Sequence, residues 1–401
     1  MTCRICSSAT RTLLDLGESP PANSLKESPD QREAFYPLVL EQCDRCGNVQ
    51  LRDCVDAQAL YSQYLYMTPD SPSLARHYAI LEHHLVDGGV LRPESAVLEI
   101  GSNTGMFLRH LHPRVRRVIG IDPAANICEV ANASGIETVC DFFNARSAAM
   151  LQDRFGRPDL IVARHCFAHN RDPHDILRGV TRLLDHQGHF LIENAYLLNT
   201  IENNEFDQIY HEHMFYYSIR SMRALLVQHG MHIVDVLLVP VHGGSIVFLA
   251  KKAAPNDRIS AAVEQQAARE DRMLTPDSFG RFVANTLEIR RQLRATISEL
   301  METRQRVYTY GATAKGNTLL NFVGITAAQV PYCVDSTPIK QGRYLPRSNI
   351  KVISEDEAFR SPPDYFLLTA WNYRDEIIAK VRRGGNSRSR FIVPIPTVTL
   401  V

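Results

Sequence analysis

The sequence carries no net charge and no long hydrophobic run. Its 44 Lys and Arg residues balance 44 Asp and Glu residues, so no overall field draws the chain to nucleic acid or to a membrane surface. The longest apolar stretch, residues 236–250, is interrupted by Pro240, His242 and a pair of glycines, which excludes a membrane helix. Low-complexity linkers and short-period repeats are also absent. We therefore expect a protein that binds neither nucleic acid nor membrane.

A secretion signal is missing too. The first residues, MTCRICSSATR, lack the apolar core of such a signal, so we expect a cytoplasmic protein whose nine cysteines stay reduced. A hydrophobic fraction of 45% and a charged fraction of 22% are typical of a globular protein with large cores. The length of 401 residues suggests two or three domains. The sequence leaves the oligomeric state open, a monomer included.

Four of the cysteines form two pairs. Two residues separate Cys3 from Cys6, and two separate Cys43 from Cys46. This spacing lets both thiolates of a pair reach one metal ion, and two pairs complete a tetrahedral zinc site. Four protein ligands leave no open position for catalysis, so the pattern predicts a structural zinc in a small N-terminal module. Four unrelated buried cysteines or a nucleic-acid-reading finger are the alternatives, and the acidic segment between the pairs argues against the finger.

Residues 95–122 have the pattern of a nucleotide-binding α/β unit. Residues 96–100 are predicted to form a buried strand, residues 101–105 (GSNTG) a turn and residues 106–111 the start of a helix. A second strand then ends at Asp122, where an acidic side chain can accept hydrogen bonds from a ribose. The loop lacks the G-x-G-x-x-G of nicotinamide enzymes, which argues against an oxidoreductase. A structural loop that binds nothing is the alternative.

Strands and helices continue to the end of the chain. Four more strands, predicted at residues 159–163, 189–194, 231–239 and 244–252, complete a doubly wound sheet. The following residues, 257–305, are predicted to be helical, with a core-facing stripe of Ile289, Leu293, Ile297 and Leu300.

A second α/β unit is predicted from residue 306 onward. Its loop GATAKGN (311–317) offers backbone N–H groups and Lys315 to an anion such as phosphate. Lys340 and Arg343 could add positive charge. Solvated surface cations around a structural loop are the alternative.

The cluster YHEHMFYY at residues 210–217 allows three interpretations. His211 and His213 would chelate a metal if they lay on a strand, where alternate side chains share a face. The second interpretation is an aromatic-rich loop without a chemical role. In the third, one histidine is a general base that an adjacent carboxylate orients. Removal of a proton beside a ketone suits the third, because a histidine can take the proton while tyrosine hydroxyls stabilise the enolate oxygen.

Taken together, these motifs resemble a known enzyme family. The pattern E-x-G-x-N-x-G at residues 99–105 resembles the first motif of class I S-adenosylmethionine methyltransferases. Over nearly its whole length, the chain resembles the three-domain, zinc-containing sugar C-methyltransferases of deoxysugar biosynthesis. The resemblance is carried by the two C-x-x-C pairs, E-I-G-S-N-T-G, IENNEFDQIYHEH (201–213), HGGS (242–245), YGATAKGN (310–317) and DSTPIKQGRYLP (335–346).

This resemblance implies a fold, a reaction and ligands. The fold is α/β, with a zinc-binding module at residues 1–70, a class I methyltransferase Rossmann-like domain at 71–252 and a second Rossmann-like domain, which binds substrate, at 253–401. The reaction is S-adenosylmethionine-dependent C-methylation of a nucleotide-diphosphate 4-keto-6-deoxysugar at the third carbon, beside the ketone. A structural Zn²⁺ is held by Cys3, Cys6, Cys43 and Cys46.

Individual residues take roles by the same resemblance. His213 is the base, and Glu212, Tyr210 and Tyr66 share its active site. Cofactor binding falls to Glu99, Gly101, Asn103, Gly105, Asp122 and Pro123. Substrate binding falls to His169, Asn204, Lys315, Asn317, Lys340 and Arg343.

Two stretches depart from the family pattern. Where N-N-V-L-A-H is frequent, the chain has RHCFAH (164–169), and where E-V-P-Y is expected it has ENAY (193–196). Arg164 could pair with an extra carboxylate or phosphate, or be a neutral change in a loop. A non-sugar ketone, a heteroatom acceptor and a non-catalytic cofactor-binding scaffold therefore remain as alternatives.

Overall fold

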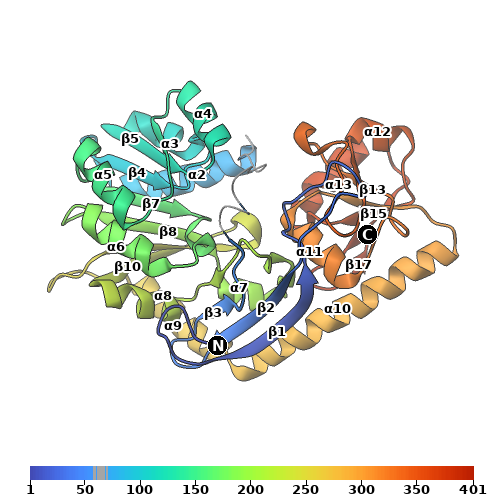
Figure 1. The fold of residues 1–401 in the computed structure, drawn as a ribbon, viewed down its shortest axis with the longest axis horizontal. Helices are drawn as coiled ribbons and strands as arrows, with labels where there is room; N and C mark the ends of the chain where they lie inside the picture. The colour runs from blue at the N-terminus through green and yellow to red at the C-terminus, as the bar shows by residue number, and fades with distance from the viewer. Residues whose placement is uncertain (57–59, 61–67, 69–70) are drawn as a thin grey trace.

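The central part of the chain forms a seven-stranded sheet in the order β10-β11-β8-β7-β4-β5-β6 (Figure 1). The computed structural model describes residues 1–56, 60, 68 and 71–401. The strands of this sheet are β4 (Ala96–Ile100), β5 (Arg117–Asp122), β6 (Thr138–Cys140), β7 (Leu160–Arg164), β8 (His189–Ala195), β10 (Met231–Val239) and β11 (Ser245–Lys252). Only β11 runs antiparallel to its neighbours in this sheet. The strand order reverses beside β4, which is where open α/β sheets bind ligands.

Helices cover both faces of this sheet. They are α2 (Pro72–Val86), α3 (Met106–Leu111), α4 (Ala125–Ala133), α5 (Ala145–Phe155), α6 (Pro173–Leu183) and α8 (Ile219–Leu226). Neighbouring residues of β4 face opposite ways, so Val97 packs in a core with α2 and α3 whereas Leu98 packs in a core with α5 and α6. Burial on both faces explains why the parallel strands are almost wholly apolar.

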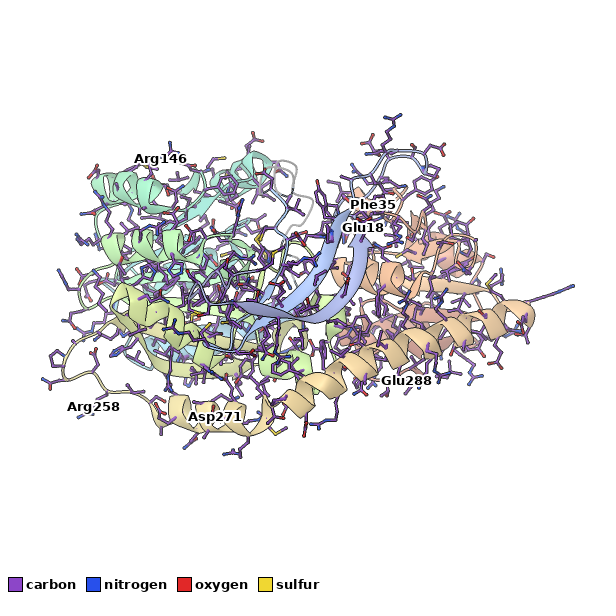
Figure 2. All side chains as sticks on the ribbon, turned by 60° about the horizontal axis from the view of Figure 1, so that its bottom comes forward. Glu18, Phe35, Arg146, Arg258, Asp271 and Glu288 are labelled. Atoms are coloured by element: carbon purple, nitrogen blue, oxygen red, sulfur yellow. The ribbon has the colours of Figure 1, made fainter. Side chains whose placement is uncertain are left out.

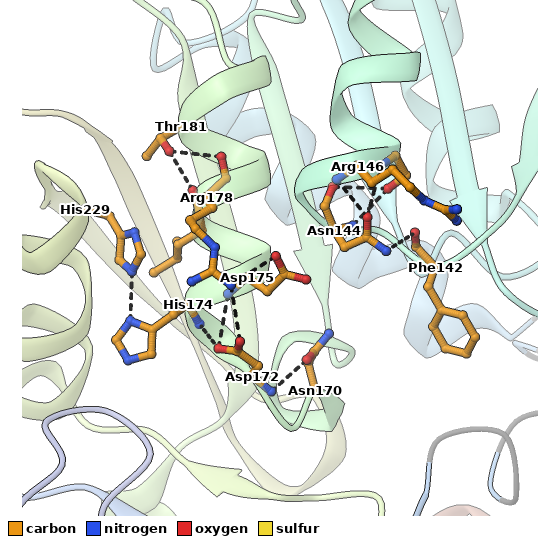
Figure 3. Close-up of polar contacts among 12 residues, drawn as sticks. Phe142, Asn144, Arg146, Asn170, Asp172, His174, Asp175, Arg178, Thr181 and His229 are labelled. Carbon is orange, nitrogen blue, oxygen red and sulfur yellow. Dashed lines mark hydrogen bonds and ion pairs between the residues drawn. The ribbon is translucent and has the colours of Figure 1, made fainter.

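Side-chain caps fix where α5 and α6 begin. Asn144 accepts hydrogen bonds from the backbone N–H groups of Arg146 and Ser147, and Asp172 accepts them from His174 and Asp175 (Figure 3). These caps satisfy N–H groups that have no partner within the helix. They hold the two helix starts at the carboxyl edge of the sheet, next to the cavity described below.

The N-terminal part forms a second, antiparallel sheet in the order β1-β2-β3-β9. Its strands are β1 (Thr10–Ser19), β2 (Tyr36–Cys43), β3 (Val49–Leu51) and β9 (Phe215–Tyr216). The last strand belongs to the YHEHMFYY segment, far along the chain. The sheet therefore joins the N-terminal module directly to the segment that holds His213.

The C-terminal part is a third sheet, in the order β14-β13-β12-β15-β16-β17, reached through two helices. The helices before it are α9 (Ala261–Met273) and α10 (Pro276–Glu302). The strands and later helices are β12 (Val307–Tyr310), α11 (Ala314–Val323), β13 (Tyr332–Val334), β14 (Lys351–Ile353), α12 (Glu355–Arg360), β15 (Tyr365–Leu368), α13 (Arg374–Arg383), β16 (Arg390–Val393) and β17 (Thr399–Leu400). The first five strands in this order are parallel, and the order reverses at β12. Both predicted α/β units are thus confirmed.

One apolar core links the N-terminal hairpin, the middle region and the C-terminal sheet. It contains the predicted stripe of α10, together with Leu14 of β1, Leu197 of α7 (Leu197–Glu202) and Phe322 of α11. The stripe is therefore core-facing, as expected. Within the described parts of the chain, no helix is long and apolar enough to span a membrane.

Candidate active site

The four paired cysteines come together at the base of the N-terminal hairpin. Their sulfur atoms all lie within 4.8 Å of one another, and the shortest separations, Cys3–Cys46 and Cys6–Cys43, are 3.5 Å each. Four thiolates at this spacing match a tetrahedral zinc site. Among the described residues this is the only such cluster of potential metal ligands.

A contact from the middle region holds the first pair of cysteines in place. The imidazole Nε2 of His174 lies 3.1 Å from the carbonyl oxygens of Arg4 and Ile5, both within the Cys3–Cys6 turn. Its other nitrogen is 2.9 Å from Nε2 of His229 (Figure 3). Because carbonyl oxygens only accept, His174 donates from Nε2 and anchors the turn to α6.

A cavity of 510 Å³ opens at the carboxyl ends of β4, β5 and β7. The structure brings five of the predicted residues to its wall, namely Gly101, Asn103, Asp122, Pro123 and His169. This position, at the reversal of the strand order, is the one where a doubly wound sheet holds a nucleoside.

The loop after β4 shapes one end of the cavity. Gly101 has φ +63°, and a Cβ there would lie 2.8 Å from the Cβ of Cys166, so only glycine allows the two loops to approach this closely. Asp122 accepts hydrogen bonds from the backbone N–H groups of Asn103 and Ala124, both at 3.0 Å. Each carboxylate oxygen keeps a lone pair that a ribose hydroxyl can use.

Two predicted cofactor residues lie behind this wall. Glu99 is 1% exposed, and its carboxylate is 2.8 Å from the guanidinium of Arg164, which does line the cavity. Glu99 therefore does not form part of the cavity wall, whereas its partner Arg164 does. Gly105 has φ +73°, and a Cβ there would lie 2.9 Å from Ile136, so its role is to let the loop pack.

The pairing of Arg164 explains one departure from the family pattern. Its guanidinium also lies over the rings of Phe107 and Tyr78, at 4.3 and 5.0 Å from their centroids. Burial raises the pKa of Glu99 to about 7, and the guanidinium of Arg164 acts in the opposite direction. Arg164 thus pairs with a carboxylate of the protein itself.

Sequence reasoning missed a second buried carboxylate beside the cavity. Glu193 is fully buried, with one oxygen 2.8 Å from Nε2 of His77 and 3.2 Å from Nε2 of His165. These histidines hold the pKa of Glu193 well below its usual value, against the effect of burial. No sequence signal links His77 on α2 with the other two residues, because the three are distant in the chain.

Asp141 and Phe142 also line the cavity and were missed. They follow β6, so they lie at the same edge of the sheet as Asp122. The strand is only three residues long and gives a weak periodic signal. The run TVCDFF at residues 138–143 was the available hint.

Residues Tyr210 to His213 form a turn, so the two histidines do not share the face of a strand. The interpretation of H-x-H as a strand chelate is therefore wrong. His211 points to the carbonyl of Tyr36, at 3.3 Å, whereas His213 contacts Tyr210.

The hydrogen bonds of His213 define its tautomer. Nδ1 lies 3.0 Å from the carbonyl oxygen of Gln208, which only accepts, so Nδ1 carries the proton. Nε2 then accepts a hydrogen bond from the hydroxyl of Tyr210, at 2.6 Å. Burial, together with the nearby His169, Lys315 and His165, holds the pKa of His213 well below its usual value. The ring is therefore neutral and can accept a proton.

His169 connects the cavity with this turn. It lines the cavity, and its ring centroid is 5.1 Å from that of His213. Burial lowers the pKa of His169 to about 3, so it too is neutral. The base candidate thus lies directly beyond the inner end of the cavity.

The remaining predicted residues of the active-site segment are buried near this turn. Glu212 is 3% exposed and accepts a hydrogen bond from the side-chain amide of Asn23, at 2.5 Å. Asn204 is 3% exposed with φ +55°, and among described residues neither polar atom of its amide has a hydrogen-bond partner. Tyr66 lies outside the described residues.

The predicted anion site of the C-terminal part lies at the start of α11. Lys315 is 3.8 Å from Glu205, Lys340 is 3.7 Å from Asp335, and Arg343 is 3.9 Å from Glu27. These are long ion pairs. Asn317 is 2% exposed, and its amide donates to the carbonyl of Ala22 at 2.6 Å.

The seven-stranded sheet, the cavity at its switch point and the four-thiolate cluster define a class I S-adenosylmethionine-dependent methyltransferase with a structural zinc module. Family models agree along the chain. They are "Putative zinc binding domain" at residues 3–61, "Methyltransferase domain" at 67–236 and "C-methyltransferase C-terminal domain" at 240–396.

The chain is 36% identical to C-methyltransferase NovU of Streptomyces niveus over 399 residues, which cover 98% of this chain and 95% of the relative. It therefore belongs to the family of three-domain, zinc-containing C-methyltransferases, and it is an S-adenosylmethionine-dependent C-methyltransferase. A shorter match, 32% over 110 residues, is to the uncharacterized methyltransferase YcgJ of Bacillus subtilis, covering 26% of this chain and 42% of YcgJ.

Solved structures of other methyltransferases share part of the architecture. Magnesium protoporphyrin IX methyltransferase from Synechocystis, with bound S-adenosylhomocysteine, is 14% identical, covers 45% of this chain and 84% of its own, and gives a TM-score of 0.35. The YcgJ structure covers 45% of this chain and 100% of its own, with 16% identity and a TM-score of 0.33.

Proposed function

We propose that the enzyme methylates the third carbon of a nucleotide-diphosphate 4-keto-6-deoxysugar, beside the ketone. The observation that carries this proposal is the neutral His213, whose ring lies 5.1 Å from His169 at the inner end of the cofactor cavity. A methyl acceptor on carbon needs a base at that carbon, whereas oxygen or nitrogen mainly needs positioning.

The base acts through its unprotonated Nε2. In the substrate-free arrangement this nitrogen accepts from the Tyr210 hydroxyl. When the sugar binds, the hydroxyl can turn from Nε2 to the ketone oxygen, which leaves Nε2 to take the proton from the neighbouring carbon. The hydroxyl then donates to the enolate oxygen as negative charge develops there.

S-adenosylmethionine supplies the electrophilic methyl group. Asp122, whose carboxylate is oriented by a hydrogen bond from the Asn103 backbone N–H, would hold the ribose. Arg164 lines the same cavity. The new carbon–carbon bond forms as the bond between methyl and sulfur breaks, and the proton removed from the sugar stays on His213.

The start of α11 suits the diphosphate of the sugar nucleotide. Helix N-terminal N–H groups and cations favour a phosphate there. The ion pairs of Lys315, Lys340 and Arg343 are all 3.7 Å or longer, so a phosphate bound there would compete only with distant carboxylates for these three cations.

The test is methyl transfer from carbon-13-labelled S-adenosylmethionine to a panel of nucleotide-linked 4-keto-6-deoxysugars, read by NMR. We expect a new methyl group on the third sugar carbon with the wild type. His213→Asn should bind the cofactor normally and transfer the methyl group more slowly by about a thousandfold or more. His211→Asn, in the same turn but directed at Tyr36, is the matched control and should remain active. Transfer to oxygen or nitrogen, or full activity in His213→Asn, would contradict the proposal.

A further inference from the structure

The loop between β1 and β2 reaches from the zinc module to the active site. Glu18 and Phe35 lie near its two ends, and in the figures the hairpin passes between the middle and C-terminal parts (Figures 1 and 2). At the tip of β1 the chain continues as Pro20-Pro21-Ala22-Asn23-Ser24. This five-residue segment, which we call the PPANS segment, contacts both other parts of the molecule.

Two hydrogen bonds of the PPANS segment are made to residue blocks with a role in the proposed reaction. The Asn23 amide donates to Oε1 of Glu212 at 2.5 Å, beside Tyr210 and His213. One residue earlier, the carbonyl of Ala22 accepts from Asn317 of α11 at 2.6 Å. The two neighbouring residues thus connect the proton-transfer turn with the proposed diphosphate site.

The loop is held rigidly on its far side. Lys26 is 3% exposed, and its ammonium lies 3.0 Å from Glu33 and 2.5 Å from the Asn349 side chain. Its backbone forms two hydrogen bonds of 2.8 Å with Tyr344. Two consecutive prolines further restrict the start of the segment. These contacts fix the loop, and the loop in turn fixes the position of the Asn23 amide relative to Glu212.

The chemistry of the pair favours orientation of the carboxylate. Glu212 is almost fully buried, and a buried carboxylate needs donors that keep it in place. An amide donates without a full charge, so it fixes the direction of Glu212 while adding little to the field at His213. A lysine at this position would add a cation close to a base that has to accept a proton.

We propose that Asn23 is a positioning residue of the active site, which fixes the Glu212 carboxylate within the Tyr210–His213 turn and makes the N-terminal module part of the catalytic unit. This inference rests on the proposed function. It predicts that the contribution of Asn23 to turnover passes through Glu212.

A double-mutant cycle tests this directly. Asn23→Ala, Glu212→Gln and the double variant are compared with the wild type for kcat and KM in methyl transfer. We expect Asn23→Ala to lower kcat about tenfold or more with little change in KM, because the buried Glu212 carboxylate loses the donor that orients it from the N-terminal module. In the Glu212→Gln background, Asn23→Ala should lower kcat by less than about twofold.

Three controls separate positioning from folding. The melting temperature, zinc content and S-adenosylhomocysteine affinity of Asn23→Ala should match those of the wild type. Ser24→Ala removes a hydroxyl that donates only within the loop, to the Pro21 carbonyl at 2.6 Å, and should keep full kcat.

The outcomes are distinguishable. Unchanged kcat in Asn23→Ala, or a loss that adds in full to that of Glu212→Gln, would refute the role of Asn23 while the wild type stays active. An inactive wild type would refute the proposed substrate and, with it, the role assigned to Asn23.

Discussion

At the scale of single residues, the tautomer of His213 follows from its hydrogen-bond partners, because a carbonyl oxygen can only accept. The Gln208 carbonyl fixes the proton of His213 on Nδ1, and this leaves Nε2 as the acceptor. From the sequence, an acid–base cluster of histidine and tyrosine at 210–213 was one of three interpretations. The tautomer was not, because it depends on a backbone carbonyl placed by the turn.

Arg164 illustrates a second limit at this scale. The sequence shows a cation where the family has asparagine, but its partner Glu99 is 65 residues away and on another strand. The structure shows that the pair is buried. Removing one member of a buried pair leaves an uncompensated charge.

Arg164→Ala is therefore expected to lower the free energy of unfolding by about 3 kcal/mol near pH 8. Burial raises the pKa of Glu99 from 4.5 to about 7, so the stability that the neutral carboxyl provides is complete below pH 4.5 and is lost as the pH rises through 7. Loss of Arg164 raises this pKa further, so the destabilisation should be smaller near pH 6. Thermal melting at both pH values measures this.

The matched control for that prediction is Arg146→Ala. The side chain of Arg146 is 84% exposed, and its removal should change stability by less than about 0.5 kcal/mol. An equal loss of stability in Arg164→Ala at both pH values would show that Glu99 does not control the effect.

At the scale of elements, the sequence predicted the longer strands correctly and missed the short ones. The apolar runs of β4, β5, β7 and β8 are strands because they are buried on both faces. In contrast, β6 has three residues and β9 only two. A strand as short as β9 forms because β3 provides a partner edge, a tertiary cause that periodicity does not contain.

Helix α11 meets the 3₁₀ turn η3 (Phe206–Gln208), and this contact includes the only tryptophan of the sequence. The indole N–H of Trp371 donates to Asp207 at 2.6 Å, and the Lys315 ammonium lies 5.3 Å from its ring centroid. Asp207 and Glu205 are both fully buried. A phosphate drawn to Lys315 would therefore change the surroundings of this ring.

Titration with a nucleoside diphosphate should change the tryptophan fluorescence of the wild type with saturation. Lys315→Ala should weaken binding about fivefold or more, because one phosphate contact is lost. Arg291→Ala, on the exposed side of α10, is the control and should bind as the wild type does. Equal affinity in Lys315→Ala would argue against the phosphate site at α11.

At the scale of the whole molecule, the N-terminal, middle and C-terminal segments are joined by direct contacts. The sequence indicated three domains with separate ligands. It did not indicate that β9 would complete the N-terminal sheet or that Asn23 would reach Glu212, 189 residues away. Such contacts depend on how the three parts of the chain pack against one another. The residues at these contact surfaces follow no periodic pattern in the sequence. The shared apolar core of β1, α7, α10 and α11 provides the stability for this docking.

The central claim is that His213 removes a proton from carbon, and solvent exchange measures that step without methyl transfer. The enzyme is incubated in heavy water with S-adenosylhomocysteine and a nucleotide-linked 4-keto-6-deoxysugar, and deuterium in the sugar is read by mass spectrometry. Because burial holds the pKa of His213 well below 6.5, the exchange rate should not fall between pH 8 and pH 6.5. We predict enzyme-dependent deuterium at the third carbon and none with His213→Asn; exchange at the wild-type rate in that variant would contradict the account.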